Sequence, residues 1–146
     1  MKKIPEYKWQ ELLERRKRAK IASYQRYINK RANSPEYFKR RLLNEVRISN
    51  RKLNVFNYAP NNTKEHEVTK FLVFMYYRDL GYDVLTEAIF NNGSRADVVV
   101  LDRELIVEIL CSETREMLDK KVVNYPSCFE IVSIDATKEF NEADLE

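Results

Sequence analysis

Two short apolar runs separated by a pair of polar residues constrain the fold of this chain most strongly. Residues Arg95–Leu101 and Glu104–Leu110 are rich in valine, leucine and isoleucine and flank the dipeptide Asp102-Arg103. This pattern predicts two antiparallel strands joined by a tight turn. A hairpin of this kind needs a second layer to cover it, so the chain is expected to build a larger sheet around it.

Each of the two runs contains one acidic residue in otherwise apolar surroundings. Burying a carboxylate there is costly unless it is paired or binds a cation. A two-residue turn places Asp97 directly opposite Glu108, with their Cβ atoms roughly 5 Å apart on one face of the sheet. Two like charges at that distance require a cation, and hard oxygen ligands suit Mg²⁺ or Mn²⁺. A three-residue turn would shift the register by one residue and separate the two acids.

The segments around the hairpin predict a mixed α/β fold. Residues 62–80 predict a helix that ends at Gly81, and Tyr82–Phe90 predict a strand. After the hairpin, Ser112–Asn124 predict a helix and Cys128–Ile134 a last strand. The resulting order of elements is αβββαβ.

The charge of the chain is distributed very unevenly. Residues 1–60 hold 17 Lys and Arg against 5 Asp and Glu, whereas residues 61–146 hold 9 against 18. The two parts carry formal charges of +12 and −9, although the whole chain carries only +3. Because phosphate backbones are the commonest polyanionic partners, nucleic acid is the expected ligand of the first part. Basic helices are also often no more than solvated surfaces, and this alternative stays open.

Residues 1–60 are expected to form a basic two-helix arm, with a domain boundary in the asparagine-rich stretch that ends near residue 60. Apolar residues at mostly helical spacing predict a first helix over residues 5–31. Ser34, Pro35 and Glu36 predict the start of a second helix that runs to about Ile48. Candidate phosphate contacts, with one from the helix after the boundary, are Arg15, Arg16, Lys17, Arg18, Lys39, Arg40, Arg41 and Lys70.

The helix at residues 62–80 offers a third acid. Its apolar stripe is formed by Val68, Leu72, Met75 and Tyr76, and Glu65 lies on the same side one turn earlier. Glu65 is therefore expected to face into the fold, whereas Glu67 is expected in solvent and His66 off the stripe. The alternative is that Glu65 only caps its own helix.

The helix after Glu108 offers a cation. Lys121 has Met117, Leu118 and Tyr125 one turn away on an apolar face, whereas Lys120 projects to the side. Lys121 is thus the predicted catalytic cation. A snorkelling lysine whose stem packs on the core would give the same pattern.

These residues resemble the PD-(D/E)XK nuclease superfamily, and most closely its branch of competence proteins similar to CoiA. The resemblance covers residues 63–134, and its motifs are Glu65-His66-x-x-x-Lys70, Gly81-Tyr82, Arg95-Ala96-Asp97-Val98 and the run Val107–Ser112. It implies a restriction-endonuclease-like αβββαβ core in residues 61–146, with the basic arm outside it.

By position, the resemblance implies that Asp97 and Glu108 bind Mg²⁺ or Mn²⁺, with the main-chain carbonyl of Ile109 as a further ligand and Glu65 as the helix acid. The superfamily's usual Lys or Gln two residues after the strand Glu is Leu110 here. In some branches this basic group comes from the following helix, and Lys121, four residues before Tyr125, occupies such a position. The implied activity is metal-dependent hydrolysis of DNA phosphodiester bonds.

Composition excludes several other classes. Two cysteines and one histidine cannot form a Cys/His zinc cage, and no apolar run approaches the roughly 18 residues of a membrane span. We expect a cytoplasmic protein without a membrane partner.

Two alternatives to a nuclease stay open. In one, the protein keeps this fold and binds DNA or DNA junctions but is catalytically silent. In the other, the basic arm mediates homodimer formation.

Overall fold

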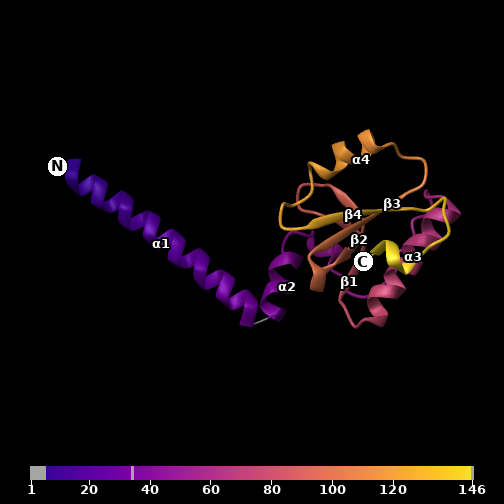
Figure 1. Cartoon of the computed structure of the whole chain (residues 1–146), viewed down its shortest axis with the longest axis horizontal. Helices are drawn as coiled ribbons and strands as arrows, with labels where there is room; N and C mark the ends of the chain where they lie inside the picture. The colour runs from indigo at the N-terminus through magenta and orange to yellow at the C-terminus, as the bar shows by residue number, and fades with distance from the viewer. Residues whose placement is uncertain (1–5, 34, 146) are drawn as a thin grey trace. The chain divides into compact units, whose positions relative to one another are not determined.

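The computed structural model describes residues 6–33 and 35–145. The chain divides into two compact units, Met1–Phe38 and Lys39–Glu146 (Figure 1). In the described ranges no helix is both long and apolar enough to cross a membrane.

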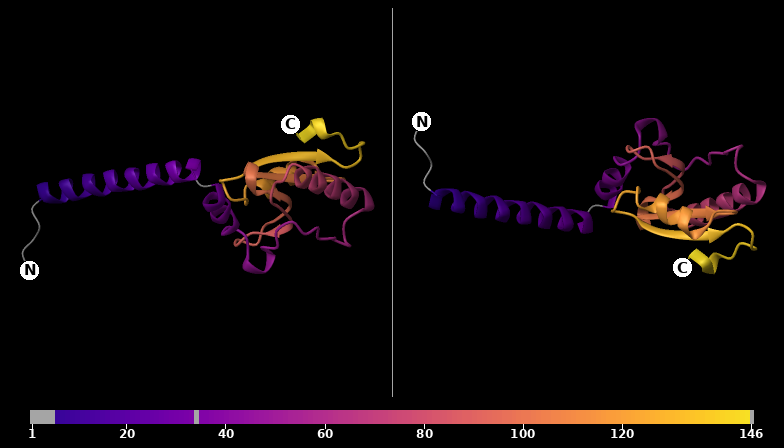
Figure 2. Two further views of the ribbon diagram at one scale, coloured as in Figure 1. Left: turned by 90° about the horizontal axis from the view of Figure 1, so that it is seen from below. Right: turned by 90° about the horizontal axis from the view of Figure 1, so that it is seen from above.

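The first unit consists mainly of helix α1, Glu6–Asn33, which is a single continuous helix (Figure 2). This confirms the predicted first helix with small differences at its ends. Its basic side chains Arg15, Arg16, Lys17 and Arg18 are all exposed, and so are the apolar Leu12, Leu13 and Ile21. A helix whose apolar side chains are exposed gains little from burial, so its stability comes from backbone hydrogen bonds and helix propensity.

Helix α2, Pro35–Leu43, ends about five residues earlier than the sequence predicts. The chain leaves the helix because the backbone of residues 45–47 pairs with the sheet instead. Val46 forms an isolated antiparallel bridge with Phe90, and Arg47 N donates to Ile89 O at 2.8 Å. Leu42 and Val46 are both buried, with 2% and 0% of their surfaces exposed.

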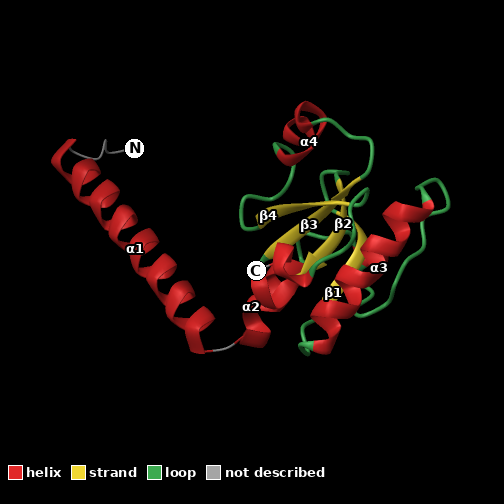
Figure 3. Ribbon diagram, turned by 45° about the vertical axis from the view of Figure 1, so that its right-hand side comes forward, coloured by secondary structure: helices red, strands yellow, loops and turns green. Residues whose placement is uncertain are grey.

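A four-stranded mixed sheet lies at the centre of the second unit (Figure 3). Its strands are β1 (Val84–Ile89), β2 (Arg95–Val100), β3 (Leu105–Leu110) and β4 (Glu130–Asp135), in the order β1-β2-β3-β4. The first three strands are antiparallel, and β4 runs parallel to β3. A parallel neighbour requires a crossover connection, and the helix α4, Arg115–Val122, supplies it.

Helix α3, Lys64–Asp79, covers one face of the sheet. Its Val73, Phe74 and Tyr77 pack into one apolar cluster with strand residues that include Val98 and Val107. The observed order of elements in this unit confirms the predicted αβββαβ arrangement and the mixed α/β class. Because side chains alternate along a strand, the positions of Asp97 and Glu108 alternate with those of Val98 and Val107, which belong to this cluster.

The boundary between the two units lies at residues 38 and 39 rather than near residue 60. Residues 44–60, expected to connect the arm to the domain, belong to the second unit because they hydrogen-bond along β1. Asn54 N donates to Val84 O at 2.8 Å, and Asn57 N donates to the Thr86 hydroxyl at 2.8 Å. An asparagine-rich composition is typical of a loop but does not show what the loop binds.

Asn54 fastens this segment to β1 and gives the first prediction. Its side chain accepts from Val84 N at 2.9 Å and donates to Asp83 Oδ1 at 3.1 Å, and its φ of 63° lies in the left-handed region. We expect Asn54→Gly to lower the free energy of unfolding by about 1–2 kcal/mol, because it loses the side-chain hydrogen bonds. Asn54→Ala should cost about 1 kcal/mol more, because alanine resists this φ. Urea denaturation measures both, and equal losses would contradict the backbone argument.

Candidate active site

The register of the central hairpin is the one that the sequence predicts. Val98 pairs with Val107, Val99 with Ile106 and Val100 with Leu105. Residues 101–103 form a short 3-10 turn, and Glu104 follows in the left-handed region with its N–H donating to Leu101 O at 3.2 Å. The turn is longer than the predicted two-residue turn, because residues 101–104 all lie outside the pairing of β2 with β3, but it preserves the register in which the next opposed pair is Asp97 and Glu108.

The paired region of β2 and β3 stops before the two acids. Pairing ends at Val98 and Val107, and beyond it the Ile109 N–H donates to Asp97 Oδ2 at 2.8 Å. A side-chain carboxylate thus accepts a hydrogen bond from a strand amide at the end of the hairpin. Asp97 and Glu108 are 7% and 0% exposed, so both carboxylates are desolvated and need partners within the protein.

Two groups near the crossover helix contact Glu108. Lys121 Nζ, from α4, donates to Glu108 Oε2 at 2.8 Å, and the Tyr125 hydroxyl hydrogen-bonds to Oε1. The structure thus brings together Lys121 and Glu108, as the sequence analysis expected. The Tyr125 oxygen also lies 2.8 Å from the Arg95 carbonyl. A phenol has one hydrogen, and a protonated Glu108 can donate to Tyr125 while Tyr125 donates to the carbonyl.

The electrostatics favour that protonated form. Burial, followed by repulsion from Asp97, raises the pKa of Glu108 to about 7, although Lys121 and Tyr125 oppose the shift. Burial acts in the same direction on Asp97, but His66, the Ile109 amide and Lys121 hold the pKa of Asp97 below its ordinary value. Burial lowers the pKa of Lys121, but Glu108 and Asp97 outweigh this and raise it. Lys121 therefore remains a cation at neutral pH.

The expectation that Glu65 of α3 faces into the fold is wrong. Glu65 is exposed, and the buried polar residues at the start of α3 are His66 and Glu67. His66 Nε2 lies 3.4 Å from Asp97 Oδ2. The predicted apolar stripe instead faces solvent, with 49% of Val68 exposed, because α3 buries a face that carries polar side chains along with its apolar ones. The hydrophobic pattern contains no signal for a buried charge whose partners come from other elements.

His66 lies between two carboxylates. Its Nδ1 is 3.4 Å from Glu67 Oε1 without hydrogen-bond geometry, and it is a buried nitrogen with no hydrogen-bond partner among the described residues. Burial lowers the pKa of His66, but Asp97 and Glu67 together raise it above its ordinary value. The two carboxylates thus favour the charged form of His66, which would partly compensate Asp97.

Lys70 does not contact solvent, so its predicted phosphate contact is wrong. It is 0% exposed, and its Nζ donates to Glu67 Oε1, Glu87 Oε1 and the Asn57 carbonyl, each at 2.9 Å. Glu87 has a φ of 51° within β1, a conformation that non-glycine residues rarely adopt in a strand. The network of charges thus joins α3 to β1 and to the preceding loop.

Lys39 is likewise a structural residue rather than a phosphate contact. Its Nζ lies 3.1 Å from Asp83 Oδ2 and 2.8 Å from Asp102 Oδ2, and 17% of its side chain is exposed. Arg40 and Arg41 are exposed, as the sequence analysis expected.

The donor chemistry at Asp97 and Glu108 fits Mg²⁺ or Mn²⁺. Among the described residues no group of three His, Cys, Asp or Glu side chains could hold a metal. Two carboxylates are nevertheless sufficient for Mg²⁺, which usually keeps several waters and completes its shell with substrate phosphate oxygens. Glu65 is exposed rather than directed into the fold, and both Glu65 and the Ile109 carbonyl stay predicted ligands.

Comparisons of this chain with protein-family models, with curated proteins and with solved structures find no match. The resemblance to the PD-(D/E)XK nucleases therefore depends on the motif residues and on the order of the elements. A function has to follow from the site itself, because a fold alone does not define one.

Lys121 gives a prediction about pH and stability. The folded state binds a proton at Glu108 between pH 4.5, the ordinary pKa, and about 7, so stability falls as pH rises through this window. Lys121→Met removes the opposing charge and should extend the fall above pH 7. We expect a loss of about 1–3 kcal/mol relative to wild type at pH 8, which is less than for a fully buried pair because 35% of the Lys121 side chain is exposed and solvent screens its charge.

The matched control is Lys120→Met, which removes one charge from the exposed neighbour of Lys121. Chemical denaturation from pH 5 to pH 9 measures both variants. A Lys121→Met curve parallel to that of Lys120→Met would mean that the contact with Glu108 does not compensate its charge.

Proposed function

We propose that this chain is a metal-dependent DNA nuclease that hydrolyses phosphodiester bonds. One observation carries the proposal: Asp97 and Glu108, two buried carboxylates at opposed positions of adjacent strands, lie beside a lysine whose Nζ is 2.8 Å from Glu108. Two facing acids can hold a metal ion that activates water, and a neighbouring cation can stabilise charge on a phosphate. A purely structural ion pair would need only one of the two acids.

In this mechanism Asp97 and Glu108, the latter after loss of its proton, would hold Mg²⁺ or Mn²⁺. When bound, the ion would neutralise charge at the phosphate and lower the pKa of a water. Lys121 stays protonated and stabilises the negative charge that develops on the phosphate oxygens. Tyr125 and the Ile109 amide orient the two carboxylates through their hydrogen bonds. His66, next to Asp97, limits the charge that the buried site accumulates.

The exposed basic side chains of α1 would bind the phosphate backbone without reading its sequence. Arg15, Arg16, Lys17 and Arg18 are consecutive, so they project around the helix rather than along one face. Such a distribution suits attraction to a polyanion better than a defined contact. Arg40 and Arg41 add two exposed cations at the second helix.

A second candidate function is a silent member of this fold that binds DNA or DNA junctions without cutting it. The observation that favours it is Leu110, which stands where the superfamily's usual Lys or Gln would stand. In addition, both oxygens of Glu108 already have partners, Lys121 and Tyr125. Metal binding would then compete with these contacts.

Cleavage assays decide between the two candidates. We expect Asp97→Asn to abolish metal-dependent cutting of supercoiled plasmid and of a labelled branched duplex, because it removes a ligand charge. DNA binding by the same variant should stay equal or become tighter, since one negative charge is lost. Assays with Mg²⁺, Mn²⁺ or EDTA measure cutting, and mobility shifts measure binding.

Lys121→Met should reduce the cleavage rate without weakening DNA binding. Lys120→Met, which removes one charge from the exposed neighbouring residue, is the matched control. Cutting by Asp97→Asn at the wild-type rate would exclude this site. Tight, salt-sensitive binding with no cutting by wild type would establish the silent alternative.

The basic helix gives a separate prediction. Replacing Arg15, Arg16 and Arg18 with glutamine should weaken DNA binding across all sequences and flatten its salt dependence, by about 0.9 in the log–log slope for each phosphate that the variant no longer neutralises. Titrations at several salt concentrations measure this slope. A variant with the same change in charge at the exposed Arg103, Lys120 and Lys138 is the control. Equal slopes for the two variants would mean that the helix does not bind DNA.

A further inference from the structure

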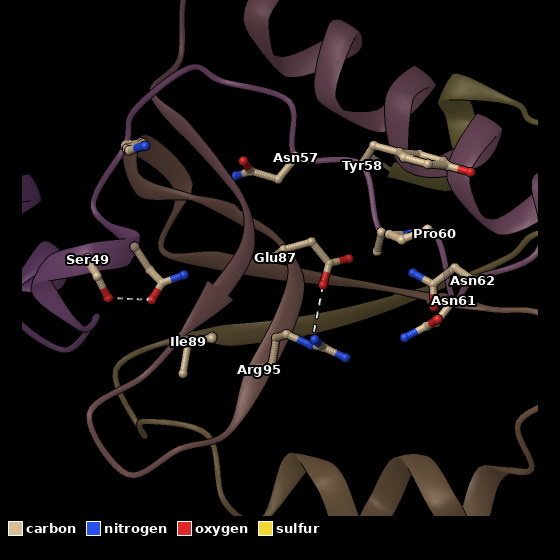
Figure 4. A pocket seen from close by; sticks show the side chains of 12 residues that line it. Ser49, Asn57, Tyr58, Pro60, Asn61, Asn62, Glu87, Ile89 and Arg95 are labelled. Atoms are coloured by element: carbon tan, nitrogen blue, oxygen red, sulfur yellow. Dashed lines mark hydrogen bonds and ion pairs between the residues drawn. The ribbon is translucent and has the colours of Figure 1, made fainter.

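A cleft of about 390 Å³ opens on the second unit between the loop at residues 57–62 and strands β1 and β2 (Figure 4). Its lining includes Asn57, Tyr58, Asn61, Asn62, Glu87 and Arg95. None of the residues assigned to metal binding or catalysis lines it. The volume is at the small end of the range for small-molecule sites, about 300–1,000 Å³, and suits one nucleotide rather than a stretch of duplex.

The cleft lies close to the candidate active site through β2. Arg95 lines the cleft, and Asp97 follows it by two residues on the same strand. Side chains two residues apart lie on the same face of a strand, separated by about 7 Å. The Arg95 carbonyl is also bonded to Tyr125, the partner of Glu108. If a DNA strand binds at Asp97, its adjacent nucleotide can therefore reach the cleft.

The charges of the cleft favour a phosphate. Glu87 is its one acidic lining residue, and both of its oxygens have cationic partners: Lys70 Nζ at 2.9 Å and Arg95 Nε at 3.3 Å. The Arg95 side chain is 62% exposed, and holding it through Nε leaves the two terminal nitrogens for a ligand (Figure 4). A guanidinium presented in this way suits bidentate binding of a phosphate.

The remaining lining suits a nucleobase. Tyr58 is 68% exposed, whereas Phe90 and Tyr125 of the same unit are buried, and it therefore offers a face for stacking. Asn61 presents an amide group, which can donate and accept hydrogen bonds in the pattern that base edges match, whereas the Asn57 amide nitrogen donates to Thr86 O at 3.0 Å. The Asn62 amide is itself held by Glu67 at 2.8 Å, which ties the loop to α3.

We propose that this cleft holds one unpaired nucleotide of the DNA substrate, with its base stacked on Tyr58 and its phosphate at Arg95. Bases of an intact duplex are stacked on each other and cannot enter, so the substrate class is single-stranded or branched DNA. The role of this nucleotide in cleavage rests on the proposed nuclease function. Its binding does not.

The test compares binding of a single-stranded 20-mer and of the blunt duplex of the same sequence, in EDTA, by fluorescence anisotropy. Tyr58→Leu should bind the single strand about 5- to 100-fold more weakly than wild type does. Its affinity for the duplex should equal that of wild type. Tyr58→Phe, which keeps the ring, should behave like wild type. Tyr7→Leu, at a tyrosine of α1 that is 63% exposed, is the control.

The ratio of single-strand to duplex affinity is the readout, because the basic helix contributes to both. An equal ratio in wild type and Tyr58→Leu would overturn the inference, and so would an equal loss in Tyr58→Phe. Because EDTA removes metal, these outcomes do not depend on cleavage. If no DNA is cut but the ratio depends on the Tyr58 ring, the proposed nuclease function fails while the binding site stands.

Discussion

The repulsion between Asp97 and Glu108 is the constraint on which the rest of this structure depends. Two carboxylates, 7% and 0% exposed, lie at opposed positions at the end of the hairpin. Burial and mutual repulsion raise the pKa of Glu108 to about 7, which shows the cost of keeping both acids in place. Three elements supply compensating groups: Lys121 comes from α4, His66 from α3 and the amide of Ile109 from β3.

The compensation extends well beyond the two acids. His66 lies within ion-pair distance of Glu67, which pairs with Lys70, and Lys70 pairs with Glu87 on β1. A continuous set of charges thus joins α3 to the sheet. Lys70 is fully buried within it, and removing one partner of such a network is costly because the others are left without compensation. The network ends at Arg95, which lines the cleft proposed for an unpaired nucleotide. Site and cleft therefore share their electrostatic support.

Strand-level features could be predicted from the sequence because they depend on local pattern. The hairpin register followed from the lengths of two apolar runs and the turn between them, and it placed Asp97 opposite Glu108 as observed. The contact of Lys121 with Glu108 agrees with the sequence prediction, although the apolar face used to predict it is only partly real: Tyr125 is buried, whereas Met117 is 56% exposed. Helix α3 was harder: its apolar stripe at Val68 faces solvent, and His66 and Glu67 are buried.

The sequence by itself determined the mixed α/β class, the order αβββαβ and the opposed pair of acids, because periodicity and turn length act over a few residues. Only the tertiary structure decided which polar side chains of α3 are buried, where α2 ends, and that Lys39 and Lys70 bind carboxylates within the protein. The physical reason is that a buried charge is stable only with its partners. Those of Lys70 on β1 and of Lys39 on the hairpin lie 17 and 63 residues away in the chain.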